Sequence, residues 1–233
     1  MYNRYFIQLS YNGTNYHGWQ YQPNALSVQE VLQEKMGVLL REKTDIMGAG
    51  RTDTGVHASE YYAHFDAQRA DLHEDEELLF KLNCMLPWDI AVHRIILMPE
   101  NAHARFAAIS RTYHYHITRK KDAFSYNRAW TVRWLNLDAD RMNRAAAILL
   151  QYKNFASFER TGSDNKTSLC DVTECYWEVN GDKMKFVITA NRFLRNMVRA
   201  VVGTLVEVGR GKLEPDDLHT IIQKQQRSEA GTS

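Results

Sequence analysis

The sequence predicts an α+β protein built from two similar units, and three observations point to this class. Short segments in which apolar residues alternate with polar ones, typical of strands, recur along the 233 residues. Segments with apolar residues at helical spacing lie between them. The order of elements seen before residue 105 then recurs from Arg111 onward. We therefore expect units at residues 1–104 and 105–233, with antiparallel sheets joined side by side and a central cleft.

The first unit is predicted to begin with a strand over residues 4–11, where every second residue is apolar or aromatic. Ser27, followed three residues later by Glu30, has the pattern of a helix capping box. A helix is therefore expected from Ser27 to about Lys43. The remaining elements of this unit are a strand at 60–66, a helix at 76–85 and a strand at 90–98.

The second unit is predicted to begin with an alternating strand over Arg111–Arg119. Tyr113 and Tyr115 lie on one face of this strand, and threonines and histidines alternate on the other. The elements that follow are a helix after Asp138, a hairpin of residues 173–179 and 183–190 that turns at Asn180–Gly181, and a last helix over 192–208.

The composition favours a globular protein of the cytoplasm. Hydrophobic residues make up 44% of the chain, and its net charge of +1 means that any basic surface must be local. The three cysteines, at 84, 170 and 175, form no CxxC pair and fit a reducing compartment. The N-terminus has no signal-peptide pattern, and no apolar run approaches the roughly 18 residues that a membrane helix needs. We therefore expect a soluble cytoplasmic protein without a membrane segment.

The most informative stretch is the glycine-rich loop at residues 48–57, which contains three glycines around Arg51 and Asp53. Glycines allow tight turns and a close approach of the backbone to a ligand. A dinucleotide fingerprint fails here because Asp53 occupies its third glycine position, and a central carboxylate would repel a phosphate. We interpret the loop as presenting Asp53, with Arg51 as its guide. A glycine-rich hairpin with a capping aspartate explains the local pattern about equally well.

The last predicted helix carries Arg192, Arg195 and Arg199 on the side opposite its apolar face. Arg199 lies among valines, and a buried guanidinium needs a carboxylate partner because an unpaired buried charge is costly. Asp53 is the carboxylate that we expect to pair with it. The alternative is a solvated arginine face on an ordinary core helix. Arg192 and Arg195 are candidate phosphate contacts under either interpretation.

Tyr113 is also open to two interpretations. A tyrosine on the apolar face of a strand usually belongs to the core. The same ring could stack on a nucleic-acid base, a contact worth about 1–3 kcal/mol. The nine histidines offer no helical pair at i and i+4, so we expect no metal site. No nucleophile elbow, Walker or kinase motif is present, which makes a small-molecule enzyme of another class a poor fit.

Five motifs, in this order, resemble those of the TruA family of tRNA pseudouridine synthases and span nearly the whole chain. They are Tyr11–Gln20, Gly50–Ala58, Arg105–Phe106, Arg111–Tyr115 and Phe193–Leu205. The resemblance implies the pseudouridine synthase fold and isomerisation of uridines 38, 39 and 40 in the tRNA anticodon stem–loop. It also implies a homodimer that holds tRNA across both subunits and uses no cofactor. A synthase that acts on other RNA uridines, or a catalytically inactive RNA-binding relative, are the alternatives.

The resemblance also implies roles for individual residues. Asp53 matches the essential catalytic aspartate, Arg51 the arginine that helps to extrude the target nucleotide, Tyr113 the active-site tyrosine, and Arg199 the basic partner of the aspartate. Whether Asp53 attacks covalently or acts as a base on the sugar stays open.

The C-terminal end departs from the family pattern. Family members usually continue past Ala230–Gly231 with a proline-rich turn and a final strand beside the active site, whereas this sequence ends at Ser233. Either the sequence is truncated there or that strand is absent, and in both cases we expect the second unit to lack it.

Overall fold

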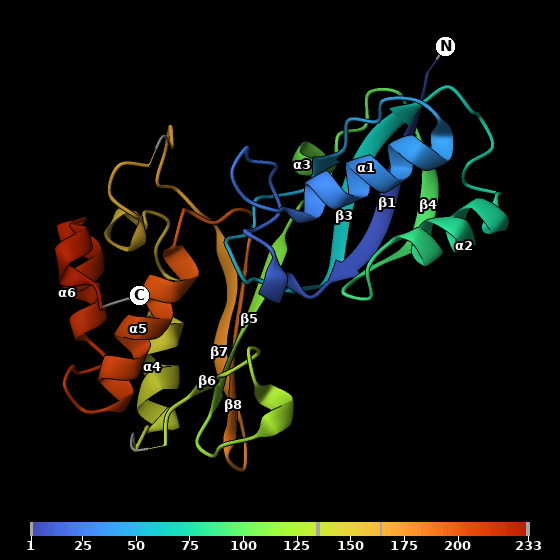
Figure 1. The fold of residues 1–233 in the computed structure, drawn as a ribbon. Helices are drawn as coiled ribbons and strands as arrows, with labels where there is room; N and C mark the ends of the chain where they lie inside the picture. The colour runs from blue at the N-terminus through green and yellow to red at the C-terminus, as the bar shows by residue number, and fades with distance from the viewer. Residues whose placement is uncertain (1, 134–135, 164, 232–233) are drawn as a thin grey trace. The chain divides into compact units, whose positions relative to one another are not determined.

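The computed structural model describes residues 2–133, 136–163 and 165–231. It divides the chain into two compact units, Met1–Ala108 and Ile109–Ser233. Each unit holds a four-stranded sheet and its own hydrophobic core, so the predicted α+β class is confirmed (Figure 1). That the two sheets join side by side around a cleft stays a prediction.

The sheet of the first unit is antiparallel throughout, with the strand order β2-β3-β1-β4. Two helices, α1 and α2, pack on one face of it (Figure 1). The elements are β1 (Asn3–Tyr11), η1 (Gly13–Asn15), α1 (Val28–Leu40), β2 (Met47–Gly48), β3 (Ala58–Ala67), α2 (Glu76–Met85), β4 (Ile90–Met98) and α3 (Ala104–Ala107).

The predicted alternation of β1 is confirmed, because Tyr5, Ile7 and Leu9 are all fully buried in the first core. Helix α1 begins where the capping pattern predicts, since the Ser27 hydroxyl accepts a hydrogen bond from the Glu30 N–H at 3.2 Å. The helix ends at Leu40, earlier than expected, because Arg41 adopts a left-handed conformation with φ of 57°.

The short helix α3 was not predicted, and it belongs to the first unit. Its Ala104 N–H donates to Nδ1 of the buried His64 on β3, at 3.1 Å. The predicted boundary after residue 104 therefore falls at the start of a helix that packs on the first sheet, and the observed boundary follows Ala108.

The second unit has the strand order β6-β5-β8-β7. Its elements are β5 (Arg111–Thr118), η2 (Ala123–Ser125), β6 (Trp130–Thr131), α4 (Ala139–Leu149), η3 (Ala156–Phe158), β7 (Val172–Asn180), β8 (Lys183–Ala190), α5 (Met197–Gly209), α6 (Asp217–Lys224) and η4 (Arg227–Glu229). Strand β6 pairs parallel with β5, so this sheet is mixed rather than wholly antiparallel as predicted. A two-residue strand has no periodicity that a sequence can reveal.

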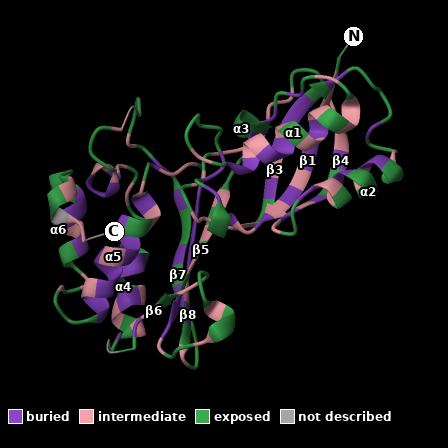
Figure 2. Cartoon of the chain, in the orientation of Figure 1, coloured by how far each residue is buried: buried purple, intermediate pink, exposed green. Residues whose placement is uncertain are grey.

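Helices α4 and α5 cover one face of the second sheet, and the core lies between these helices and the sheet (Figure 2). Phe186 and Ile188 on β8 and Val201 and Leu205 on α5 are buried there. The opposite face of the sheet is polar. On it, the Thr112 and Thr189 hydroxyls share a hydrogen bond of 2.8 Å.

The last predicted helix begins later than the sequence indicated. Helix α5 starts at Met197, and Asn196 before it has a left-handed φ of 66°. Arg192 and Arg195 therefore precede the helix, and the prediction that both share one helical face with Arg199 is wrong. The apolar residues Phe193 and Leu194 fit the predicted helical pattern, but they lie on an irregular segment ahead of the helix.

Candidate active site

The glycine-rich loop of the first unit is held at its start by the sheet. Gly48 on β2 pairs with Ala63 on β3, and the next N–H, that of Ala49, donates to the Tyr62 carbonyl at 2.8 Å. The Tyr61 hydroxyl donates to the Gly50 carbonyl and accepts from the Gly50 N–H. These contacts fix the backbone just ahead of Arg51 and Asp53.

Three buried aromatic rings lie beneath this loop. Trp19 and Tyr61 have ring centroids 4.3 Å apart, and Tyr11 meets Tyr61 edge to face at 5.6 Å. A Cβ on Gly48 would lie 2.1 Å from the Tyr61 hydroxyl oxygen and 2.5 Å from Trp19 Nε1. Position 48 must therefore be glycine for lack of space above the rings.

The segment Tyr11–Gln20, the first of the five motifs, packs directly against the glycine-rich loop. The Trp19 N–H donates to the Thr52 carbonyl at 3.3 Å, and the Tyr11 and Thr52 hydroxyls are 2.9 Å apart. Gly18 has φ of +89°, and a Cβ there would lie 2.3 Å from the Thr52 carbonyl oxygen. Both conformation and space thus require glycine at position 18.

A second set of contacts locks the end of the loop. The Gly13 N–H donates to His57 Nδ1 at 3.0 Å, and the Gly55 N–H donates to the Tyr16 carbonyl at 3.2 Å. The Tyr16 hydroxyl donates to Asp89 at 2.6 Å, and burial followed by this carboxylate raises the pKa of Tyr16 well above its usual value. The two segments therefore form one rigid support for residues 51–54.

Asp53 and Arg51 project from this support and are both exposed. The Asp53 carbonyl accepts a hydrogen bond from the Val56 N–H at 3.2 Å, which closes a turn. Within the described part of the chain, no hydrogen bond or ion pair involves the Asp53 carboxylate. A capping aspartate would accept backbone N–H groups through its side chain. The geometry therefore favours the interpretation in which the loop presents Asp53.

Tyr113 lies in the second unit, on the face of β5 that α5 partly covers. It is half-buried, and its ring meets Phe193 edge to face with centroids 5.0 Å apart. Tyr115 lies on the same face. Burial raises the pKa of Tyr115, and the positive charge of nearby Arg199 opposes this rise. Tyr113, Tyr115, Phe193 and Arg199 thus come together around the start of α5.

Arg199 is exposed, not embedded among the valines of α5 as predicted. It is the third residue of the helix, on the side away from the buried Met197, Ala200 and Val201. The argument that a buried guanidinium requires a carboxylate therefore does not apply. Its pairing with Asp53 stays a prediction that depends on the family resemblance.

The two arginines that precede α5 have different surroundings. Arg192 is half-buried, donates to Asn165 Oδ1 at 3.4 Å and lies near Cys170. Arg195 is exposed, and its carbonyl accepts from the Arg160 N–H at 3.0 Å. Both side chains stand on an irregular segment next to the Tyr113 and Phe193 pair.

The structure thus groups the predicted residues by unit. Asp53 and Arg51 lie together in the first, and Tyr113, Arg192, Arg195 and Arg199 lie in the second. Sequence reasoning missed the supporting role of Tyr61, because nothing in the alternation of β3 distinguishes it from an ordinary core residue. In the described ranges, no group of three or more histidine, cysteine or acidic residues could hold a metal ion, and no helix is long and apolar enough to cross a membrane.

Comparison with known proteins places this arrangement in a family. Residues 145–233 match a family model described as tRNA pseudouridine synthase. The chain is 50% identical to the tRNA pseudouridine synthase A of Bacteroides fragilis, over 99% of this chain and 91% of that protein. It is 48% identical to the protein of that name from Porphyromonas gingivalis, over 99% and 92%. The chain is also 38% identical to the tRNA pseudouridine synthase A of Thermoanaerobacter sp., over 97% of this chain and 92% of that protein.

These matches, together with the two α+β units, define an isomerase that acts on RNA. The chain belongs to the tRNA pseudouridine synthase A (TruA) family.

Proposed function

We propose that this enzyme converts uridines 38, 39 and 40 of the tRNA anticodon stem–loop to pseudouridine, with Asp53 as the catalytic carboxylate. Family membership supports the reaction. The observation that carries the assignment of Asp53 is its exposed side chain, which has no partner among the described residues and stands on a loop fixed at both ends. We further propose that the enzyme works in the cytoplasm as a homodimer that holds tRNA across both subunits.

The reaction breaks the bond between N1 of uracil and C1′ of ribose and joins C5 to C1′, while C5 loses a proton and N1 gains one. Reactant and product are isomers, so the chemistry balances without a donor or an electron carrier. An ionised Asp53 either attacks covalently or removes a proton from the sugar, and both routes need an exposed carboxylate. In this proposal Arg199 orients the Asp53 carboxylate through an ion pair.

The other residues act on the geometry of the substrate. A base within a stem–loop must leave the stack before it can react, which costs a few kcal/mol. Arg51, two residues from Asp53, fills the space that the flipped nucleotide leaves. Tyr113 stacks on the extruded base and accepts the proton from C5, while Arg192 and Arg195 contact phosphates.

Replacement of Asp53 tests this proposal. We expect Asp53→Asn and Asp53→Ala to abolish pseudouridine formation while the Kd for unmodified tRNA stays within about twofold, since the carboxylate acts on the reacting sugar. Chemical mapping at positions 38–40 measures product. The matched control is Asp45→Ala, which removes another exposed carboxylate of the same unit, one that pairs with Lys43 at 3.4 Å.

The outcomes separate the alternatives. Product from Asp53→Asn would disprove the role of Asp53. Product from the wild type only at other uridines would identify a synthase of different specificity. Binding of tRNA by the wild type without any product would identify an inactive relative.

A further inference from the structure

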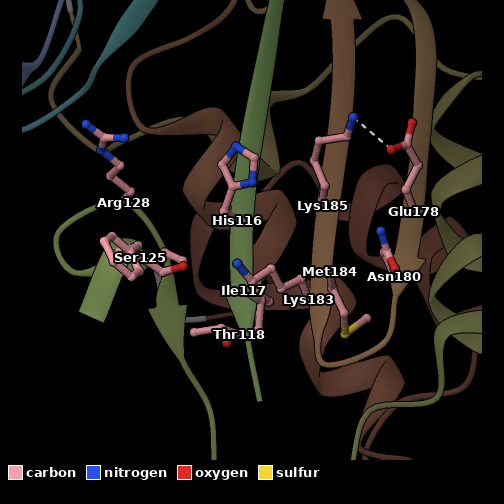
Figure 3. Close-up of a pocket in the computed structure, with 12 residues that line it drawn as sticks. His116, Ile117, Thr118, Ser125, Arg128, Glu178, Asn180, Lys183, Met184 and Lys185 are labelled. Atoms are coloured by element: carbon pink, nitrogen blue, oxygen red, sulfur yellow. Dashed lines mark ion pairs between the residues drawn. The ribbon is translucent and has the colours of Figure 1, made fainter. Parts of the chain in front are cut away.

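A second candidate site lies on the polar face of the second sheet, opposite helices α4 and α5. It is a hollow of about 490 Å³ between β5, β7, β8 and the segment around η2 (Figure 3). His116 and Lys185 line it and are paired across β5 and β8, whereas their neighbours Ile117 and Phe186 point into the core. We call this hollow the distal basic pocket.

One wall of the distal basic pocket is fixed to the sheet by Asp122. Its carboxylate accepts from the Phe124 N–H at 3.0 Å and from the Ser125 hydroxyl at 2.7 Å, and so caps η2. It also forms an ion pair with Lys183 on β8 at 2.8 Å. Lys183 and these hydrogen bonds lower the pKa of Asp122 to about 2. The wall is thus held in place at any pH near neutrality.

Positive charge is concentrated around this pocket. Figure 3 shows Arg128 at one side of it, on the segment after η2, and Lys183 and Lys185 on β8, with His116 between Arg128 and Lys185. Three cationic side chains line it, Arg128, Lys183 and Lys185, against one lining carboxylate, Glu178. The adjoining segments add Lys120 and Lys121 and the carboxylates Asp122 and Asp182. This local surplus stands out in a chain whose net charge is only +1.

Ion pairs with the carboxylates account for only part of this charge. Lys185 pairs with Glu178 at 2.7 Å, Lys120 with Asp182 at 2.6 Å, and Lys183 with Asp122. Arg128 is exposed, and its guanidinium forms no ion pair or hydrogen bond with the other described residues. A guanidinium of this kind is suited to a phosphate, which it can bind through two parallel hydrogen bonds.

The pocket also presents an exposed aromatic ring. Phe124 lines it and is 93% exposed, and Tyr126 close by is 79% exposed. Exposed rings beside cations are the combination with which proteins bind nucleic acid, because bases stack on the rings while cations contact the backbone. A two-fold contact between copies of this chain would instead bring the same positive surface against itself.

We propose that the distal basic pocket binds the phosphate backbone of the tRNA substrate, away from the uridine that reacts. This inference rests on the proposed function for its choice of RNA. His116 and Tyr113 are three residues apart on β5, about 10 Å, and lie on opposite faces of the sheet. The pocket must therefore contact a different part of the tRNA from the base that stacks on Tyr113.

The double variant Arg128→Ala/Lys183→Ala tests the proposal. Its matched control is Arg144→Ala/Lys153→Ala, which also removes one exposed arginine and one lysine paired with a carboxylate, Lys153 with Asp171 at 2.7 Å. Both control residues lie outside the lining of the pocket. The Kd for unmodified full-length tRNA is measured by fluorescence anisotropy between 50 and about 300 mM salt, together with the turnover rate at saturating tRNA. Thermal unfolding checks that both variants are folded.

We expect the pocket variant to bind tRNA about tenfold more weakly and to lose about one to two from the slope of log Kd against log salt, since each phosphate contact contributes roughly 0.9. Turnover at saturation should stay at the wild-type value, and Arg128→Lys/Lys183→Arg should restore binding. The control should match the wild type.

Three results would overturn the proposal. These are an unchanged Kd and salt slope in the folded pocket variant, an equal loss in the control, or a change of association state by analytical ultracentrifugation, which would make the pocket a subunit contact. If the wild type makes no pseudouridine at 38–40, the proposed function fails. The comparison of tRNA Kd values still decides whether the distal basic pocket binds tRNA.

Discussion

The glycines near Asp53 differ in what they require of the chain, and the difference can be tested at single positions. Gly48 has no room for a Cβ, whereas Gly55 has φ of +77° and no atom within 4 Å of where a Cβ would stand. The first position is restricted by packing and the second by backbone conformation.

We expect Gly48→Ala to lower the free energy of unfolding by about 1–3 kcal/mol, because the new methyl group would push the Tyr61 and Trp19 rings apart. Activity should fall with it, since the same rings support the Asp53 loop. Gly55→Asn is the control, because asparagine tolerates a positive φ and meets nothing there. Chemical denaturation measures both variants. Equal loss in the two would show that space at position 48 is not the limiting factor.

His64 makes stability depend on pH. Burial, reinforced by the positive charge of Arg4, lowers the pKa of His64 from 6.5 to about 4. The unfolded chain therefore binds a proton between these values that the folded chain does not. The folded protein therefore keeps its full free energy of unfolding above pH 6.5. Part of this free energy is lost as the pH falls from 6.5 toward 4.

We expect acid to lower the free energy of unfolding of His64→Asn by about 1–3 kcal/mol less than that of the wild type. Asparagine keeps an acceptor for the Ala104 N–H but cannot be protonated. The measurement is the free energy of unfolding of wild type and variant at pH 7.5 and pH 4.5. An identical difference between the two pH values in both proteins would exclude His64 as the source.

Helix α1 anchors the support of the active site. Its first free N–H groups, on Val28 and Gln29, donate to the carbonyls of Gly18 and Trp19 at 3.3 and 3.0 Å. Ser27 caps the same end with a hydroxyl that is fully buried. The helix start and the aromatic segment below Asp53 are therefore one hydrogen-bonded structure.

We expect Ser27→Ala to destabilise the protein by about 0.5–2 kcal/mol, the usual cost of losing an N-cap hydroxyl, and to slow turnover as the segment loosens. Ser27→Gly should lower stability by only a few tenths of a kcal/mol, because glycine is tolerated at N-caps. Thermal unfolding and single-turnover rates report the two effects. A fully stable Ser27→Ala variant would mean that backbone carbonyls alone hold the helix start.

The long elements were predictable and the short or context-dependent ones were not. Helix α2 and strand β4 have the predicted bounds, because each carries a full period of apolar residues. Strands β2 and β6 have two residues each and exist only through their neighbours. The start of α5 depends on the left-handed Asn196, and its position also decides that Arg199 is exposed.

At the scale of the whole molecule, the loop that presents Asp53 could be found from residue types, but the proposed pairing with Arg199 of the second unit could not. An exposed aspartate among glycines is a local pattern. A link from Asp53 to Arg199 joins residues of two separate compact units, and no spacing along the chain specifies it. That expectation came from the predicted burial of Arg199, which the structure does not show, and from the family resemblance.

The three cysteines report on the folding of the whole chain. Cys84 is exposed on α2, whereas Cys170 and Cys175 are buried in the core of the second unit. Burial raises the pKa of Cys170 to about 11 and raises that of Cys175 as well, which keeps both thiols protonated.

We expect iodoacetamide at pH 8 to alkylate Cys84 in the native protein and to reach Cys170 and Cys175 only when the second core opens. Mass spectrometry of the digested protein locates the label, and Cys84→Ser should leave the native protein unlabelled. Labelling of Cys170 as fast as Cys84 would contradict the packing described for this core.

The interlocking of two loops in the first unit has a consequence for exchanging parts between relatives. Gly13 and Gly18 fit against the backbone of Val56 and Thr52 with no room for a side chain. Tyr11–Gln20 and the glycine-rich loop therefore behave as one module although they are distant in sequence. In chimeras of this enzyme with its relatives, a crossover between the two segments should fail whenever the parents differ at these contacts, and recombination that moves both together should succeed.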